Sequence, residues 1–402
     1  MLKIIPGLNL ISFDATKCIV ICLNNKLLIL IIAKYFEMKS RLRFLLLIFI
    51  IHIFSGSSFS SAKEPPSFSK RAKNIILFIG DGMGAAHITA GMTVSNQSFY
   101  LEQFPYSGFS ITQSADNYIT DSGAGGTAIA CGLKTNNGMI GVTPDNRKVL
   151  SITEIAHNNG LSTGIVSTSA ITHATPASFV AHNASRDNYE EIALDFLNGT
   201  LDLFVGGGED HFRKRADGRD LALELENQDF DVVYTIDELK SSNSPKIAGL
   251  LAKLHMPPVS GGRAGLLEVM TRKAIEILSR DKDGFFLMVE GSMIDWGSHE
   301  NNIDYTVSET IDMDKAIGVA LEFANKNRKT LVVVTADHET GGLTLPGGNL
   351  TENKIIANFS SADHTGVMVP VFSYGSGAQL FSGIHENTFF LESFVNLLRI
   401  KK

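Results

Sequence analysis

Short apolar runs rich in β-branched and aromatic residues recur along this chain and alternate with stretches of helical periodicity. The runs lie at 75–79, 165–167, 203–205, 232–235, 285–289, 331–335 and 369–373. Helix-like stretches between several of them lie at 151–158, 189–197, 268–278 and 307–324. Apolar strands that alternate with helices are typical of a mostly parallel sheet with helices on both faces. The sequence therefore predicts an α/β fold.

Residues 63–402 are predicted to form a single domain. The whole chain has 402 residues, of which 44% are hydrophobic and 19% charged, as is ordinary for a soluble globular protein. The domain would be long for a single unit, and insertions explain its length. The polar stretch 206–262 is interrupted by Gly and Pro, so we expect surface excursions there.

Residues 38–62 have the pattern of a signal peptide. A basic segment at 38–43 precedes an apolar run at 44–54, and small residues follow up to 60–62. The run is shorter than the roughly 20 residues that span a bilayer, although an uncleaved anchor is the alternative. Residues 1–37 precede this complete signal and are interpreted as a misassigned upstream extension, with a genuine long leader as the alternative. We expect a bacterial protein that is exported, periplasmic or secreted, with no stable membrane association after cleavage.

The charge of the chain separates into a basic N-terminus and an acidic remainder. The formal net charge is −7, yet residues 1–62 hold seven basic and two acidic side chains. The remainder has 28 basic and 40 acidic side chains, a net charge of −12. Affinity for a phosphate backbone needs clustered Lys and Arg, so we expect no nucleic-acid partner. Cys131 is the single cysteine of the expected mature chain, which excludes an intramolecular disulfide there.

Three of the predicted strands are followed directly by acids and histidines. The segments that follow them read GDGMG (80–84), EGSMIDWGSH (290–299) and ADHETGG (336–342). In open α/β sheets, ligands bind at the carboxyl ends of strands. A single Asp after a strand is usually a helix cap or a turn residue. Three such segments at one sheet edge nevertheless indicate a shared site.

The side chains in these segments are of the types that bind zinc and magnesium. Zinc takes imidazole nitrogen and carboxylate oxygen in a four-coordinate shell. Asp295 and His299 are four residues apart, so on a helical turn they share one face. The adjacent Asp and His at 337–338 can both turn toward one ion from a loop. Magnesium prefers oxygen ligands, which Asp81, Glu290 and a threonine hydroxyl can supply.

Ser122 is the candidate nucleophile. It lies at the predicted start of a helix of small residues, where free backbone amides favour an oxyanion or a phosphate. The alternative is that Asp121 and Ser122 form a plain N-cap. No G-x-S-x-G elbow surrounds the serine, which disfavours the α/β-hydrolase mechanism. A zinc ion bound to Ser122 would lower its pKa without a histidine base.

From about residue 73 to its end, the chain resembles the bacterial alkaline phosphatases. The motifs that carry the resemblance, in the family's order, are GDGMG (80–84), TDS (120–122), THATPA (172–177), SRD (185–187), EG (290–291), DWGSH (295–299), TADHET (335–340) and HTG (364–366). The resemblance implies hydrolysis of small-molecule phosphate monoesters on an alkaline-phosphatase-like three-layer sandwich. Only 23 residues separate Thr340 from His364, which implies a reduced crown insertion. The resemblance to the family also implies a homodimer.

The resemblance further implies two zinc ions, one magnesium ion and a role for each site residue. The implied ligands are Asp295, His299 and His364 for one zinc, Asp81, Asp337 and His338 for the other, and Asp81, Thr175 and Glu290 for magnesium. Ser122 would form a phosphoserine, and Arg186 would hold two phosphoryl oxygens through its planar fork. His173 and Trp296 stand where the best-known enterobacterial pattern has Asp and Lys. Contacts around magnesium and phosphate therefore differ from that pattern.

Three other functions fit parts of the sequence. A phosphodiesterase or phosphonate-ester hydrolase would use the same two-metal core, but a diester has one fewer free oxygen for Arg186 to hold. A non-catalytic exported phosphate- or metal-binding protein would not need Ser122 together with a full ligand set. A zinc esterase is disfavoured by the missing elbow. For Arg186 itself, the alternative is a surface ion pair with Asp187 or Glu190.

Six further histidines of the predicted catalytic domain lie outside these motifs. They are His87, His157, His182, His211, His255 and His385. Because none has ligand spacing, we interpret them as surface or hydrogen-bonded structural histidines.

Overall fold

The computed structural model describes residues 8–13, 18–23, 26–30 and 68–402, which belong to two compact units, Met1–Pro65 and Pro66–Lys402. In the first unit, strands β1 (Leu8–Phe13), β2 (Cys18–Leu23) and β3 (Lys26–Leu30) pair antiparallel. The predicted signal peptide at 38–62 lies outside the described residues. Among the described residues, no helix has the length and apolar character needed to cross a membrane.

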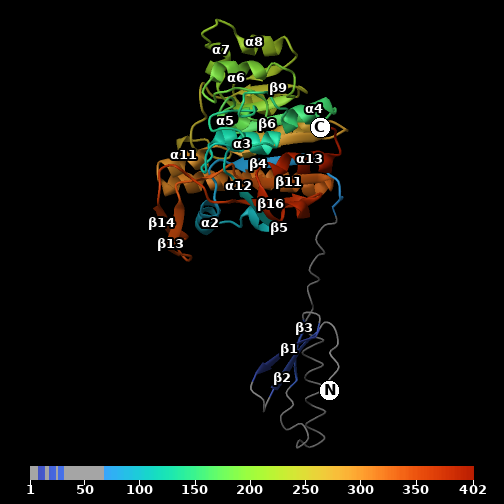
Figure 1. Cartoon of the computed structure of the whole chain (residues 1–402), viewed down its shortest axis with the longest axis vertical. Coiled ribbons are helices and arrows are strands. Elements are labelled where there is room, and N and C mark those ends of the chain that lie inside the picture. Colours follow the sequence, from blue (N-terminus) through green and yellow to red (C-terminus); the bar gives the residue numbers. More distant parts are fainter. Residues whose placement is uncertain (1–7, 14–17, 24–25, 31–67) are drawn as a thin grey trace, which may run out of the picture. The chain divides into compact units, whose positions relative to one another are not determined.

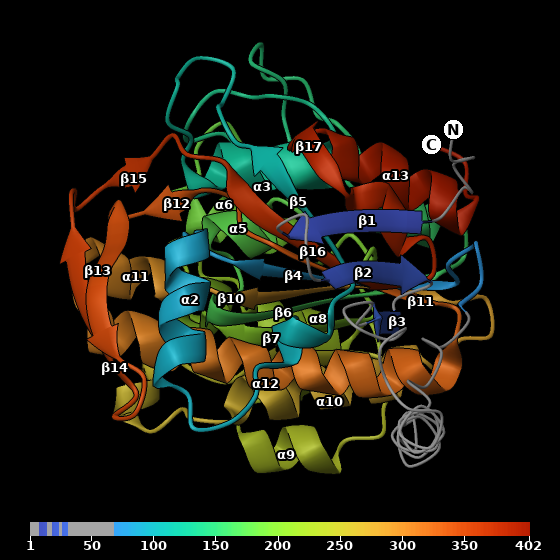
Figure 2. The same cartoon turned by 90° about the horizontal axis from the view of Figure 1, so that it is seen from below.

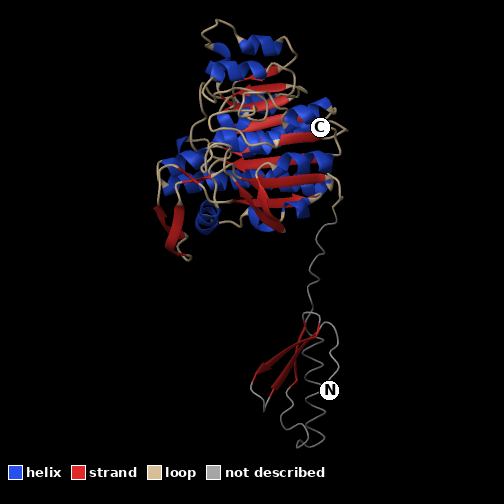
Figure 3. Cartoon of the chain, in the orientation of Figure 1, coloured by secondary structure: helices blue, strands red, loops and turns tan. Residues whose placement is uncertain are grey.

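The second unit is built on one ten-stranded sheet, drawn in Figures 1 and 3 with helices along both faces. In spatial order its strands are β17 (Gly383–Glu386), β5 (Tyr106–Ile111), β16 (Val369–Gly375), β11 (Thr330–Thr335), β4 (Asn74–Gly80), β10 (Phe285–Gly291), β6 (Ser162–Ala170), β7 (Leu203–Gly207), β9 (Ile247–Leu250) and β8 (Asp231–Val233). From β11 to β8 every pairing is parallel, whereas β16 runs antiparallel to β11 and β5. All seven predicted strands belong to this sheet, so the prediction of a mostly parallel α/β fold is confirmed.

Alternate side chains of the central strand β4 belong to two separate hydrophobic clusters. Ile75, Leu77 and Ile79 pack in one cluster, and Ile76 and Phe78 pack in the other. The first cluster includes residues of α3 (Ser122–Cys131), α4 (Ile152–Asn158) and α13 (Phe389–Leu398), and the second includes residues of α10 (Leu266–Leu278) and α12 (Ile303–Asn327). Figure 2 shows α3 and α13 on one face of the sheet and α10 and α12 on the opposite face. A strand buried on both faces needs apolar residues throughout, which explains the continuous apolar runs of the sequence.

Shorter helices fill the connections. They are α2 (Ala85–Val94), α5 (Ala174–Ala177), α6 (Tyr189–Asp195), α7 (Glu209–Arg213), α8 (Leu221–Glu226), α9 (Ile236–Ser241) and α11 (Met293–His299), with 3-10 turns at Tyr100–Gln103, Val259–Gly261 and Ala378–Phe381. The segment 206–262 differs from the expectation of surface excursions. It contains α7, α8 and α9, and its strands β8 and β9 extend the sheet.

The expected reduced crown is a two-stranded hairpin. Strand β13 (Leu343–Asn349) pairs antiparallel with β14 (Lys354–Phe359). At its base, β12 (Glu339–Thr340) pairs with β15 (His364–Thr365), and Thr340 lies opposite His364. This short ladder brings His364 back beside the segment that follows β11.

The register of the central strands aligns their carboxyl ends. Gly80 of β4 lies opposite Gly291 of β10, and Ile79 lies opposite Thr335 of β11. The three polar segments that follow these strands therefore begin at the same edge of the sheet.

Candidate functional site

Donor atoms from the strand-end segments, together with those of His173 and His364, converge into three groups, each within 4.8 Å. The groups are Asp295, His338 and His364; Asp81, Asp337 and His338; and Asp81, His173 and Glu290. The second group has the residues expected for one zinc ion. The first group contains His338, whereas His299 was expected as its third member. The third group contains His173 together with Asp81 and Glu290, the two carboxylates expected for magnesium.

His299 lies at the same place as the first group. Helix α11 puts Asp295 and His299 on one face, with His299 Nε2 3.3 Å from Asp295 Oδ1. His299 Nδ1 lies 2.6 Å from the Ala362 carbonyl oxygen, and His364 Nδ1 lies 2.9 Å from that of Thr120. Both Nδ1 atoms can donate to a carbonyl, which leaves Nε2 as the ligand atom. The two Nε2 atoms are 3.1 Å apart and therefore face the same point.

Glu290 is held by hydroxyl groups at the third group. Its Oε2 accepts hydrogen bonds from Ser167 Oγ at 2.5 Å and from Ser292 Oγ at 2.6 Å. Thr175 Oγ1, the expected magnesium ligand, lies 3.4 Å from Asp81 Oδ2. The elements β6, β10 and α5 thus supply most of the oxygen atoms around the third group.

Three buried polar atoms at the third group have no hydrogen-bond partner among the residues that the structure describes. They are Asp81 Oδ1, Glu290 Oε1 and His173 Nδ1. Buried polar atoms almost always have a partner, because leaving one unsatisfied costs about 1–3 kcal/mol. Two carboxylate oxygens and an imidazole nitrogen are metal ligands by type, so the residues present fit a bound cation.

The buried carboxylates of the site repel one another. Burial and the neighbouring Asp337 raise the pKa of Asp81 well above its usual range. Burial, with Asp295 and Glu290 nearby, raises the pKa of Asp337 to about 8. Burial also lowers the pKa of His338, which leaves its imidazole neutral and able to act as a ligand. Divalent cations would compensate this concentration of negative charge.

Ser122 is the first residue of α3 and is buried. Asp121 performs the capping, because its Oδ1 accepts the backbone N–H of Ala124 at 2.9 Å. The Ser122 hydroxyl is not needed for the cap and lies 3.2 Å from His338 Nε2. Asp121 is therefore the N-cap of α3, and Ser122 is not required for that function.

Arg186 lies beside the nucleophile. Its Nη1 donates to Asp121 Oδ2 at 2.8 Å, so the residue that caps α3 also orients the guanidinium. This pair replaces the surface pair with Asp187 or Glu190 that the sequence allowed. About a fifth of the Arg186 side chain stays exposed, and its one ion pair engages Nη1.

The two positions that differ from the enterobacterial pattern are in contact. The ring centroids of His173 and Trp296 are 6.0 Å apart, in edge-to-face geometry. His255 packs against both, with its centroid 4.7 Å from that of Trp296 and 5.6 Å from that of His173. Burial lowers the pKa of His173 to about 3, so this ring is neutral.

Several residues around the site were not singled out in the sequence for a role there. They are Asp121, Ser167, Ser292, Thr340, His87 and His255. Their signals in the sequence are weak, since Ser and Thr near strand ends are common turn and cap residues.

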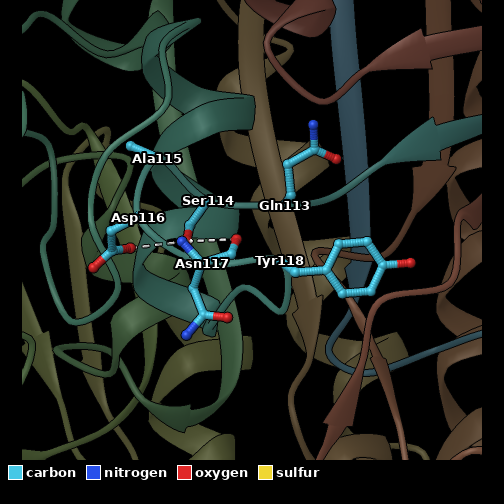
Figure 4. A pocket seen from close by; sticks show the side chains of 6 residues that line it. All are labelled: Gln113, Ser114, Ala115, Asp116, Asn117 and Tyr118. Atoms are coloured by element: carbon cyan, nitrogen blue, oxygen red, sulfur yellow. Dashed lines mark hydrogen bonds between the residues drawn. The ribbon is translucent and has the colours of Figure 1, made fainter.

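The loop that leads to Ser122 carries a pocket lined by residues 113–118 (Figure 4). Ser114 Oγ donates to Asp116 Oδ1 at 3.0 Å within this loop. The ring of Tyr118 lies against Gly366, two residues after His364, where a Cβ atom would collide with it. None of the donor residues lines this pocket, so it is separate from the metal-ligand cluster.

Comparison with known proteins gives consistent results. A family model described as alkaline phosphatase matches residues 72–359. The chain is 33% identical to alkaline phosphatase 4 of Bacillus subtilis, over 84% of this chain and 91% of that protein. It is 32% identical to the alkaline phosphatase of Escherichia coli, over 79% and 84%. The solved alkaline phosphatase from the Antarctic bacterium TAB5 is 41% identical, with a TM-score of 0.79, and is matched over its whole length and 83% of this chain.

Proposed function

The chain belongs to the alkaline phosphatase family, and from this premise we propose that it hydrolyses phosphate monoesters through a phosphoserine on Ser122, with two zinc ions and one magnesium ion as cofactors. The observation that carries the proposal is the position of the Ser122 hydroxyl. It lies at a helix N-terminus, 3.2 Å from a histidine that belongs to two of the donor groups. An incoming phosphate would meet the serine, the donor groups and Arg186 together.

The proposed ligands of the three ions match one donor group fully and the other two in part. We assign Asp295, His299 and His364 to one zinc, Asp81, Asp337 and His338 to the other, and Asp81, Thr175 and Glu290 to magnesium. Bound there, the ions would supply Lewis-acid stabilisation of negative charge on the attacking and leaving oxygens and on the phosphoryl group. A mutant of the TAB5 enzyme in which a histidine is replaced by glutamate is described with Mg bound in its M3 site. In this chain, support for magnesium comes from the oxygen atoms of Asp81, Thr175 and Glu290.

The reaction proceeds in two displacements at phosphorus. The Ser122 oxygen attacks, the bond from phosphorus to the leaving oxygen breaks, and the alcohol departs with a proton. Water then attacks the phosphoserine, the bond to the serine oxygen breaks, and phosphate leaves while Ser122 regains its proton. Throughout, Arg186 holds two phosphoryl oxygens, and Asp121 keeps the guanidinium in place. The free amides at the start of α3 add favourable interactions with the phosphoryl oxygens.

Replacing Arg186 by alanine should slow monoester hydrolysis about 10- to 100-fold. A hydrogen bond to a charged group contributes about 1.5–3 kcal/mol, and each 1.36 kcal/mol is about tenfold in rate. A diester has one fewer free oxygen, so any diesterase activity should change much less. Kinetics with p-nitrophenyl phosphate and bis-p-nitrophenyl phosphate measure both effects.

Arg186→Lys is the matched control, because it keeps the charge and loses the bidentate fork. We expect its monoesterase activity to fall between those of wild type and Arg186→Ala. Equal losses for both substrates would assign Arg186 a structural role. A diesterase activity above the monoesterase activity in wild type would favour the phosphodiesterase alternative, and no hydrolysis by the metal-loaded protein would favour a binding protein.

We further propose that residues 38–62 are a signal peptide, that residues 63–402 are the mature catalytic domain, and that the protein is exported to the periplasm or secreted. Residues 1–37 would then be an upstream extension. The N-terminal sequence of the protein purified from its host should begin near Lys63. A protein that begins at Met1 would contradict the proposal, as would stable recovery in the membrane fraction. The family also leads us to expect a homodimer, which light scattering in solution would test.

A further inference from the structure

A buried imidazole lies beside the donor groups without belonging to any of them. His87 is in the first turn of α2 and is fully buried. Its Nδ1 lies 3.1 Å from the backbone nitrogen of Gly84, and its Nε2 lies 3.1 Å from both the Thr340 carbonyl oxygen and Ser298 Oγ. The Gly84 N–H can only donate, so Nδ1 is the acceptor and the proton is on Nε2. Burial lowers the pKa of His87, in agreement with this neutral form.

The three partners of His87 come from the three strand-end segments, which carry most of the donor residues. Gly84 belongs to the segment after β4 that contains Asp81, Ser298 precedes His299 at the end of α11, and Thr340 lies two residues after His338. These segments are far apart in the sequence, because His87 and Thr340 are separated by 253 positions. One side chain thus joins all three segments.

Thr340, which contacts His87, also contacts two of the proposed ligands. Its backbone N–H donates to the Gly82 carbonyl oxygen at 3.1 Å. Its hydroxyl donates to Asp295 Oδ1 and lies 3.2 Å from His338 Nδ1. A proton on His338 Nδ1 that is donated to this hydroxyl leaves Nε2 free as the ligand atom. The position of Thr340 therefore sets the geometry of a carboxylate in one donor group and of an imidazole that belongs to two.

We propose that His87 is a positioning residue that holds these three segments in the geometry required for metal binding. The inference rests on the proposed function, since it assumes that the donor groups bind zinc. Partners that orient metal ligands typically change metal affinity 10- to 100-fold when they are removed. His87 should act in this way although it supplies no donor atom to any of the three groups.

The test compares His87→Ala and His87→Gln in the full mature protein. Glutamine suits this first-turn position, because its amide oxygen can accept the Gly84 N–H and its amide nitrogen can donate to Thr340. Metal-free protein is titrated with zinc against a chromophoric chelator, and its melting temperature is measured separately. We expect His87→Ala to weaken zinc binding roughly 10- to 100-fold and His87→Gln to stay within about threefold of wild type.

His182 is the matched control. Its Nδ1 lies 2.7 Å from the Gly141 carbonyl oxygen and its Nε2 2.9 Å from Glu154, and it contacts none of the donor residues. His182→Ala should lower the melting temperature but leave zinc affinity unchanged. If His87→Ala does not fold, His87→Met, which fills the space without a donor, replaces it.

Unchanged zinc affinity in folded His87→Ala or His87→Met would overturn the inference, as would an equal loss in His182→Ala. Those results leave the proposed function standing. If wild-type protein itself binds no zinc, the proposed function and this inference both fail, so the two failures are distinguishable.

Discussion

Replacing Ser122 by alanine should lower kcat/KM for a phosphate monoester by a factor on the order of 10³ or more. The hydroxyl lies 3.2 Å from His338 and is the proposed attacking oxygen, so without it no phosphoserine can form. A small residual activity is expected, because water at a metal centre can attack phosphorus directly. Steady-state kinetics with p-nitrophenyl phosphate on metal-loaded protein measure the effect.

The variant must keep its fold and its metals for this result to count. Asp121 caps α3, so loss of the Ser122 hydroxyl should change the melting temperature little. Ser114→Ala, in the neighbouring loop and outside the donor groups, is the matched control and should retain nearly full activity. Wild-type activity in Ser122→Ala would mean that the nucleophile is assigned to the wrong residue.

Removing metal with a chelator should reduce activity to below about 1% of that of the loaded enzyme. Zinc should restore turnover, and the reconstituted protein should contain about two zinc ions and one magnesium ion per chain. A serine hydrolase that used His338 as a general base for Ser122 would keep its activity after chelation. Full activity in a protein free of transition metal would therefore contradict the proposed chemistry.

Metal removal should also make stability depend on pH. In the metal-free protein, the pKa of Asp337 is raised to about 8 by burial and by Asp295 and Glu290. Its unfolded value is about 4, so the folded state holds the proton more tightly. This contribution to stability is complete below about pH 4 and is lost as pH rises through about 8.

Thermal melts of chelated protein between pH 5 and pH 8 test this expectation. The melting temperature of the wild type should fall more steeply with pH than that of Asp337→Asn, which cannot ionise at this position. Metal-loaded wild type should show a smaller fall, because a bound cation favours the charged carboxylate. Identical slopes for the two metal-free proteins would show that Asp337 does not titrate in this range.

The sequence predicted the central strands from their continuous apolar runs and missed some strands that are interrupted or short. All residues of β4 and β10 are buried, so their apolar runs are continuous. In β5 most side chains are exposed or partly exposed, and Ser and Gly interrupt it. Its place in the sheet comes from pairing with β16 and β17, which no local pattern reveals. The short strand β9 is buried, but it contains Gly249 and lies in a polar segment, so it was also missed.

The site was predictable to the extent that its residues follow strands. Asp81, Glu290 and Asp337 stand at strand ends, and parallel register brings those ends together. The groups that orient them come from elsewhere. Ser167 reaches Glu290 across 123 positions, and His87 reaches Thr340 across 253. Such contacts depend on how close two segments lie in the folded chain. They cannot be predicted from single residues of common types.

Acid quenching during turnover of a monoester that carries a labelled phosphoryl group, followed by peptide mapping, would settle the role of Ser122. We expect one phosphoryl group per active chain, on the peptide that contains Asp121 and Ser122, with fragmentation locating it on the serine. Ser122→Ala should give no labelled peptide under the same conditions. An active, metal-loaded enzyme that carries no label at any time point, or carries it on another residue, would contradict catalysis through Ser122.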